Sequence, residues 1–113
     1  MKKEDLEIKF VNYLSRKSKK DGSVYGEFYV KDKVARLRKL QQVLPVSTLI
    51  NITDKNYFHI TDKIMKEFSQ TVGTTKGRYK YADYLVVLRL LYEMNNGGKQ
   101  VKRYAYYAGV KVV

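Results

Sequence analysis

Four segments of the chain place apolar residues three and four positions apart, which is the spacing of one face of an α-helix. The first segment covers residues 3–17, the second 26–44, the third 55–70 and the fourth 79–95. The fourth segment is apolar on nearly all sides, which is typical of a helix in the middle of a core. The pattern therefore predicts an all-α protein built as a four-helix bundle.

Turn-forming and capping residues lie between the predicted helices. The dipeptide Asp21-Gly22 indicates a turn after the first helix. Thr53 or Asp54 is expected to be the N-cap of the third helix, because a short side-chain oxygen can accept a hydrogen bond from a free backbone N–H. The run 95–98, Asn-Asn-Gly-Gly, is expected to end the fourth helix, since glycine readily adopts the left-handed conformation that follows many helices.

The C-terminal segment differs from the rest because it is basic and rich in Tyr and Val. Two sets of residues alternate in this segment: Val101, Arg103, Ala105, Tyr107 and Gly109 with Lys102, Tyr104, Tyr106 and Ala108. The pattern is compatible with a strand, a linker or the first element of a further domain. We therefore expect a helical domain over residues 1–98 and a short basic tail, with a possible strand, over residues 99–113.

The formal net charge is +12 in 113 residues, and its distribution is uneven. Residues 16–39 hold nine Lys and Arg against three acidic residues, and residues 76–113 hold eight against two. The remaining segments are neutral overall. Two positive blocks would attract a polyanion and gain free energy by releasing its counterions, which favours nucleic acid as the partner.

The sequence offers little for catalysis, metal binding or membrane insertion. It contains no Cys and a single His, His59, and a lone His makes a poor metal site. It has no Gly-rich phosphate loop, and no apolar run approaches the ~18–20 residues that span a bilayer. We expect a cytoplasmic, nucleoid-associated protein that is not an enzyme, binds no cofactor or metal and does not engage a membrane.

Cationic and amide side chains on the second predicted helix are the first candidates for contact with DNA. Lys31, Arg38 and Gln42 share one stripe, and the small Ala35 between them leaves room for a close approach. Arg and Gln can make bidentate contacts with base edges, whereas Lys more often meets phosphates. The alternative is a solvated helix face without a partner. The complete set on this helix is Lys31, Lys33, Arg36, Arg38, Lys39 and Gln42.

A second group of candidates lies at the start of the fourth predicted helix. Hydroxyl groups, backbone N–H groups and cations at a helix N-terminus can hold a phosphate. Further along this helix Arg89 is another candidate, although it could instead pair with Glu93, four residues later. The residues near the helix start are Thr75, Lys76, Arg78 and Lys80.

The tyrosines fall into two predicted groups. Those at helical spacing are expected in the core, with the hydroxyl group reaching a polar partner. Those of the tail are expected to be free to stack on bases or to pack a terminal strand. The first group is Tyr13, Tyr81, Tyr84 and Tyr92, and the second is Tyr104, Tyr106 and Tyr107.

Several short motifs follow one another in a recognisable order: FVNYL in the first helix, ITDKN before the third, and YADYLVVLRLLYE in the fourth. Over about residues 5–98 this order resembles the N-terminal core-binding domain of tyrosine recombinases and phage integrases. The resemblance implies a SAM-like four-helix bundle that forms half of a clamp around double-stranded DNA, with possible self-association on the DNA. It implies a role in the site-specific recombination of a mobile element.

The same resemblance assigns contacts to the second and fourth helices. The contact set it implies is Lys31, Arg38, Gln42, Lys76, Arg78 and Arg89. The family's catalytic domain, with its Arg, Lys and His residues and its tyrosine nucleophile, has no counterpart in these residues, so no tyrosine here is assigned that role.

Two other readings of the sequence stay open. One is a small phage or plasmid regulator that binds RNA or an acidic protein complex through the same positive surface. The other is a protein-interaction module that uses the Tyr- and Val-rich tail over residues 99–113.

Overall fold

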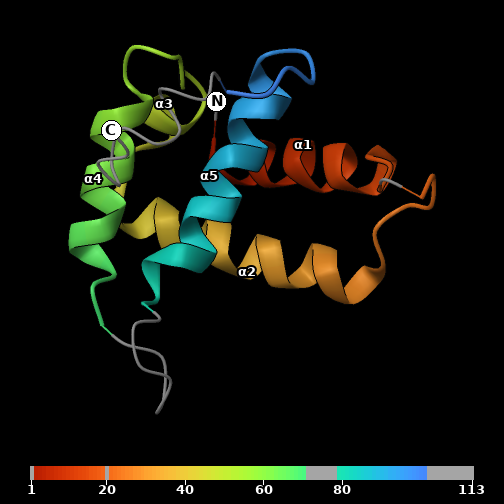
Figure 1. The fold of residues 1–113 in the computed structure, drawn as a ribbon, viewed down its shortest axis with the longest axis horizontal. Helices are drawn as coiled ribbons and strands as arrows, with labels where there is room; N and C mark the ends of the chain where they lie inside the picture. The colour runs from red at the N-terminus through yellow and green to blue at the C-terminus, as the bar shows by residue number, and fades with distance from the viewer. Residues whose placement is uncertain (1, 20, 71–78, 102–113) are drawn as a thin grey trace. The chain divides into compact units, whose positions relative to one another are not determined.

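The computed structural model describes residues 2–19, 21–70 and 79–101, and within these ranges it contains five α-helices and no β-strand (Figure 1). Four helices match the predicted ones: α1 (Lys3–Arg16), α2 (Glu27–Val43), α4 (Tyr57–Glu67) and α5 (Tyr81–Asn95). The fifth, α3 (Val46–Leu49), was not predicted. The all-α class is thus confirmed. None of the helices in the described ranges is long and apolar enough to cross a membrane.

The chain divides into two compact units, Met1–Ile50 and Asn51–Val113. Helices α1, α2 and α3 belong to the first unit, and α4 and α5 belong to the second. The predicted division into residues 1–98 and a tail stays a prediction, because most of that tail lies outside the described residues.

The first unit is built on the packing of α1 against α2, which lie side by side in Figure 1. Leu6, Phe10 and Leu14 repeat every four residues and form the buried face of α1. Burial of apolar side chains of this size contributes roughly 1.5–3 kcal/mol each. The facing residues of α2 are Val34, Leu37, Leu40 and Gln41.

Gln41 is a buried polar residue on that face, and its amide group needs a partner. Its Nε2 atom donates a hydrogen bond to the backbone oxygen of Lys3 at 3.3 Å. This bond ties the end of α2 to the beginning of α1, and it explains why a glutamine can occupy the apolar stripe.

The connection between α1 and α2 is a tight hairpin that confirms the predicted turn at Asp21-Gly22. Gly22 has a φ of +87°, a conformation that costs little only for glycine. Asp21 Oδ1 accepts hydrogen bonds from the backbone N–H of Ser23 at 2.9 Å and from its hydroxyl group at 2.6 Å. These bonds, the hydroxyl bond first, lower the pKa of Asp21. An antiparallel bridge between Ser18 and Val24 closes the hairpin.

The additional helix α3 follows directly after α2. Pro45 is its N-cap residue, and the Pro45 oxygen accepts hydrogen bonds from the N–H groups of Thr48 at 3.0 Å and Leu49 at 3.2 Å. Leu49 is fully buried. Proline ends α2 because it cannot continue a helix, and its fixed φ is compatible with the start of the next one.

The second unit is built on the packing of α4 against α5. Tyr57 is buried in α4 and meets the ring of Tyr92 edge to face at 5.8 Å between centroids. Phe68 stacks on Tyr84 at 3.8 Å. The apolar residues of this segment at helical spacing, Phe58, Ile60, Ile64, Met65 and Phe68, would be expected on the inward side of α4, but for Phe58 this is wrong, since it is 41% exposed. Tyr57, the residue before Phe58, faces the core instead.

Thr53 caps the turn that precedes α4, although the N-cap residue of the helix itself is Asn56. The Thr53 N–H donates to Asn56 Oδ1 at 2.7 Å, and the Asn56 N–H donates to Thr53 Oγ1 at 3.4 Å. This reciprocal pair has the form of a capping box. The predicted helix start was therefore two residues too early, while the capping chemistry of Thr53 is present.

The predicted end of α5 is confirmed. Asn95 is its last residue, and Gly97 and Gly98 follow with φ values of +66° and +85°. The Gly98 N–H donates to the oxygen of Glu93 at 2.8 Å, which satisfies one of the free carbonyl groups at the helix end.

Candidate nucleic-acid interface

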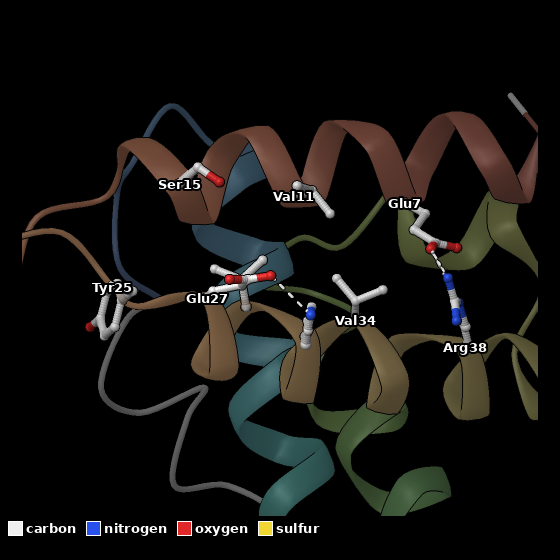
Figure 2. A pocket seen from close by; sticks show the side chains of 9 residues that line it. Glu7, Val11, Ser15, Tyr25, Glu27, Val34 and Arg38 are labelled. Carbon is white, nitrogen blue, oxygen red and sulfur yellow. Dashed lines mark hydrogen bonds and ion pairs between the residues drawn. The ribbon is translucent and has the colours of Figure 1, made fainter.

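Two of the cations predicted to contact DNA, Lys31 and Arg38, are held by acidic residues of the same unit (Figure 2). Lys31 Nζ lies 2.9 Å from Glu27 Oε1, one turn earlier in α2. Arg38 Nε lies 3.1 Å from Glu7 Oε1 in α1. The hydrogen bond from Arg38 to Glu7 raises the pKa of Arg38, so its charge is retained. The stripe predicted from helical spacing therefore contains two local ion pairs.

Two further cations share one carboxylate on the other side of α2. Lys33 Nζ lies 3.1 Å from Asp32 Oδ2, and Arg36 forms an ion pair with the same side chain. Burial acts to raise the pKa of Asp32, but the hydrogen bonds from Arg36 and Lys33 outweigh it, and the pKa lies below its usual value. Asp32 is thus ionised near neutral pH and offsets part of the positive charge of α2.

Lys39 and Gln42 complete the predicted contact residues of α2, and both are exposed. Within the described parts of the chain, neither forms a side-chain hydrogen bond or an ion pair. Helical spacing places them on the outer face of α2 together with Ala35, which is also exposed. This outer face is the portion of the predicted stripe that is open to a partner.

The structure places fewer of the candidates near α5. Thr75, Lys76 and Arg78 lie outside the described residues. Lys80 precedes the first residue of α5 and is exposed. Arg89 lies half-buried within α5, one turn before the buried Glu93. The prediction of a phosphate site at this helix start remains a prediction.

A groove of about 780 Å³ runs between α1 and α2 in the first unit (Figure 2). Val11 of α1 and Val34 of α2 point toward one another across it, and Tyr25 lies at the end next to the hairpin. The ion pairs of Lys31 and Arg38 border this groove. The lining of the groove is mainly apolar, and the opposite charges of the two ion pairs at its border balance each other.

At the hairpin end of the first unit, lysines lie over the rings of tyrosines, and these contacts were not predicted from the sequence. Lys17 Nζ lies 6.0 Å from the ring centroid of Tyr13, and Lys19 Nζ lies 5.6 Å from that of Tyr25. A cation within about 6 Å of an aromatic face is attracted by the ring. These contacts hold positive charge against aromatic surface at the end of α1 and in the loop.

The same arrangement continues into α2. The rings of Tyr25 and Tyr29 stack at 4.2 Å between centroids with an interplanar angle of 16°. Lys33 Nζ lies 4.9 Å from the centroid of Tyr29. We call the group formed by Lys17, Lys19, Lys33 and the three tyrosines the hairpin cluster.

A sequence signal for the hairpin cluster exists. Tyr13 and Lys17 are four residues apart, as are Tyr25 and Tyr29, and Tyr29 and Lys33. Residues at this spacing are neighbours on a helix surface. Tyr13 had been predicted as a core residue, yet it is half-buried and contacts Lys17.

The described residues contain no group of three or more His, Cys, Asp and Glu side chains that could hold a metal ion. His59 is exposed on α4. The chemistry available in the described ranges is therefore that of charges, hydrogen bonds and aromatic surfaces.

Comparison with known proteins found no match to a family model, to a curated protein or to a solved structure.

Proposed function

We propose that this chain is a DNA-binding domain that holds double-stranded DNA mainly through its phosphates. The observation that carries the proposal is the hairpin cluster, together with the outer face of α2. Lys17 lies over Tyr13 and Lys19 over Tyr25 at the hairpin end of the first unit, and the exposed Lys39 extends the positive surface along α2. Such a surface matches the regular negative charge of a nucleic-acid backbone.

The ion pairs of α2 are compatible with this role. Exposed ion pairs contribute little to stability because water and salt screen them. A phosphate can therefore replace Glu27 beside Lys31, or Glu7 beside Arg38, without loss of the fold. The pairs keep both cations ordered at the edge of the helix before DNA arrives.

The resemblance to recombinase core-binding domains adds a finer proposal. In that reading the helices form a SAM-like bundle that serves as the non-catalytic half of a clamp in site-specific recombination of a mobile element. The second candidate is a small phage or plasmid regulator that binds RNA or an acidic protein complex, and the same positive surface supports it.

A fluorescence-anisotropy titration of labelled duplex DNA at two salt concentrations tests the proposal. We expect binding that weakens steeply as salt rises, because each phosphate contact releases about 0.9 counterions. Structured RNA as competitor separates the two candidates: duplex DNA should displace the probe at lower concentration than RNA does.

Charge reversal of Lys39 provides the matched variant. Lys39→Glu should weaken DNA binding and make the salt dependence shallower, because Lys39 is exposed on the outer face of α2. Lys63→Glu makes the same change of charge on the exposed side of α4 and serves as the control. Equal loss in both variants would show that only net charge matters, and the assignment to α2 would be wrong.

A further inference from the structure

Phe28 is the most exposed large apolar residue among the described residues, with 88% of its surface accessible. It lies in the first turn of α2, between Tyr25 and Tyr29 in sequence. Val24, four residues earlier, is also exposed, at 57%. An aromatic ring in this position contributes nothing to the core, so packing does not account for it.

The surroundings of Phe28 are aromatic and positively charged. The stacked rings of Tyr25, just before α2, and of Tyr29, in its first turn, flank Phe28 in sequence, and Lys19 and Lys33 lie over their faces. Helical spacing also places Phe28 on the same side of α2 as Ala35 and Lys39, all of which are exposed. A protein or membrane partner would cover apolar surface, but this surface is interleaved with cations.

We infer that the first turn of α2 binds an unpaired base of the nucleic acid, with Phe28 as the stacking surface and the exposed Lys31 and Lys39, on the same side of the helix, as contacts for the flanking phosphates. Aromatic rings beside cations are the combination by which proteins hold single-stranded segments, since every base has an aromatic face and every nucleotide a phosphate. This inference rests on the proposed function and narrows it. The partner would be DNA with a gap, a frayed end or a displaced base, rather than a fully paired duplex alone.

The experiment compares two labelled DNAs of the same length, an intact duplex and a duplex with a short single-stranded gap, against the wild-type chain and Phe28→Ala. We expect the wild type to prefer the gapped DNA. Phe28→Ala should lower affinity for the gapped DNA by about 5- to 150-fold, the range for loss of one stacked base. Its affinity for the intact duplex should change little.

A fluorescent base analogue in the gap gives a second readout. When 2-aminopurine stacks on an aromatic ring its emission falls, so the wild type should quench it and Phe28→Ala should not. Phe28→Trp should restore both affinity and quenching, because it restores an aromatic face. Phe58→Ala is the matched control, since Phe58 is an exposed phenylalanine on α4, and it should behave as the wild type. An unchanged melting temperature for Phe28→Ala shows that the fold is intact.

The outcomes separate the inference from the function on which it rests. If the wild type binds both DNAs equally and Phe28→Ala changes neither affinity, DNA binding stands and the base site is wrong. If the wild type binds neither DNA at low salt, the proposed function fails and the base site fails with it. If Phe28→Ala weakens binding of inorganic polyphosphate as much as of gapped DNA, the effect does not come from a base, and the inference is overturned.

Discussion

Tyrosines have opposite roles in the two units of this chain. In the first unit Tyr25 and Tyr29 stack at the surface, and lysines lie over their rings. In the second unit Tyr57 and Tyr92 are buried and meet edge to face. A tyrosine ring is apolar on its faces and polar at one end, so it can serve either environment. The neighbouring residues decide which environment a tyrosine occupies. They are lysines in the first unit and apolar helix residues in the second.

The hydroxyl group of the buried tyrosine shows how the second unit accommodates a polar end. Tyr92 donates a hydrogen bond to Asp54 Oδ1 at 2.6 Å, and Asn96 Nδ2 donates to the Ile52 oxygen at 3.3 Å. Both bonds tie the segment before α4 to α5. The second unit thus uses its polar groups for internal connections, while the first unit exposes many of them on the outer side of α2.

The largest expected effect comes from removing a buried ring. Tyr57→Ala should destabilise the chain by about 3–5 kcal/mol, the usual range for a buried aromatic residue replaced by alanine. Phe58→Ala, at the next position but 41% exposed, should cost much less. Urea denaturation of both variants measures the difference. Similar losses would contradict the register of α4 described above.

A smaller effect is expected from removing only the hydroxyl group. Tyr92→Phe should cost about 1–3 kcal/mol, because it leaves Asp54 without the hydrogen bond at 2.6 Å. Tyr25→Phe is the control in the first unit and should leave the free energy of unfolding nearly unchanged. Chemical denaturation gives both values, and an equal loss in the two variants would refute the contrast between the units.

Freeing a cation of the first unit should strengthen DNA binding. In Glu7→Gln the ion pair with Arg38 is weakened, and Arg38 becomes available to a phosphate. Affinity should rise, and the salt dependence should steepen by about 0.9 for one added phosphate contact. Glu67→Gln makes the same charge change on the exposed surface of α4. A rise as large in that control would assign the effect to net charge alone.

The smallest expected effect is on acid stability. The hydrogen bonds from Ser23 lower the pKa of Asp21 below its ordinary value of 3.8 in the folded chain. The stabilisation is therefore present above that ordinary value and is lost as pH falls through the lower, folded-state pKa. Asp21→Asn should flatten the acid side of a plot of melting temperature against pH. An acid limb as steep as that of the wild type would exclude this carboxylate as a contributor.

Local signals predicted the turn after α1 and the end of α5, whereas one side of α4 was misjudged. Asp21-Gly22 and the run 95–98 were recognised because a turn needs a left-handed backbone, which glycine provides whatever surrounds it. The inward side of α4 was misjudged at Phe58, although Tyr57 lies three and seven residues before the buried Ile60 and Ile64, the spacing that places residues on one helix face.

The candidate site shows the same limit. Helical spacing groups Lys31, Arg38 and Gln42 on one side of α2, but spacing within α2 carries no information about α1. Glu7 is far from Arg38 in sequence and reaches it only because the helices pack side by side. The hairpin cluster was not predicted because its tyrosine–lysine pairs belong to two different helices, which a loop separates in the sequence.

The sequence by itself determined the all-α class, the four longer helices, the turn at Asp21-Gly22 and the excess of positive charge, because each depends on residues close together in the chain. The tertiary structure alone decided which cations meet acidic residues, which tyrosines are buried and that Phe28 is exposed. These depend on distances between helices, and the Coulomb and packing energies involved fall off within a few ångströms. Residues such as Glu7 and Arg38 come within that range only after the chain has folded.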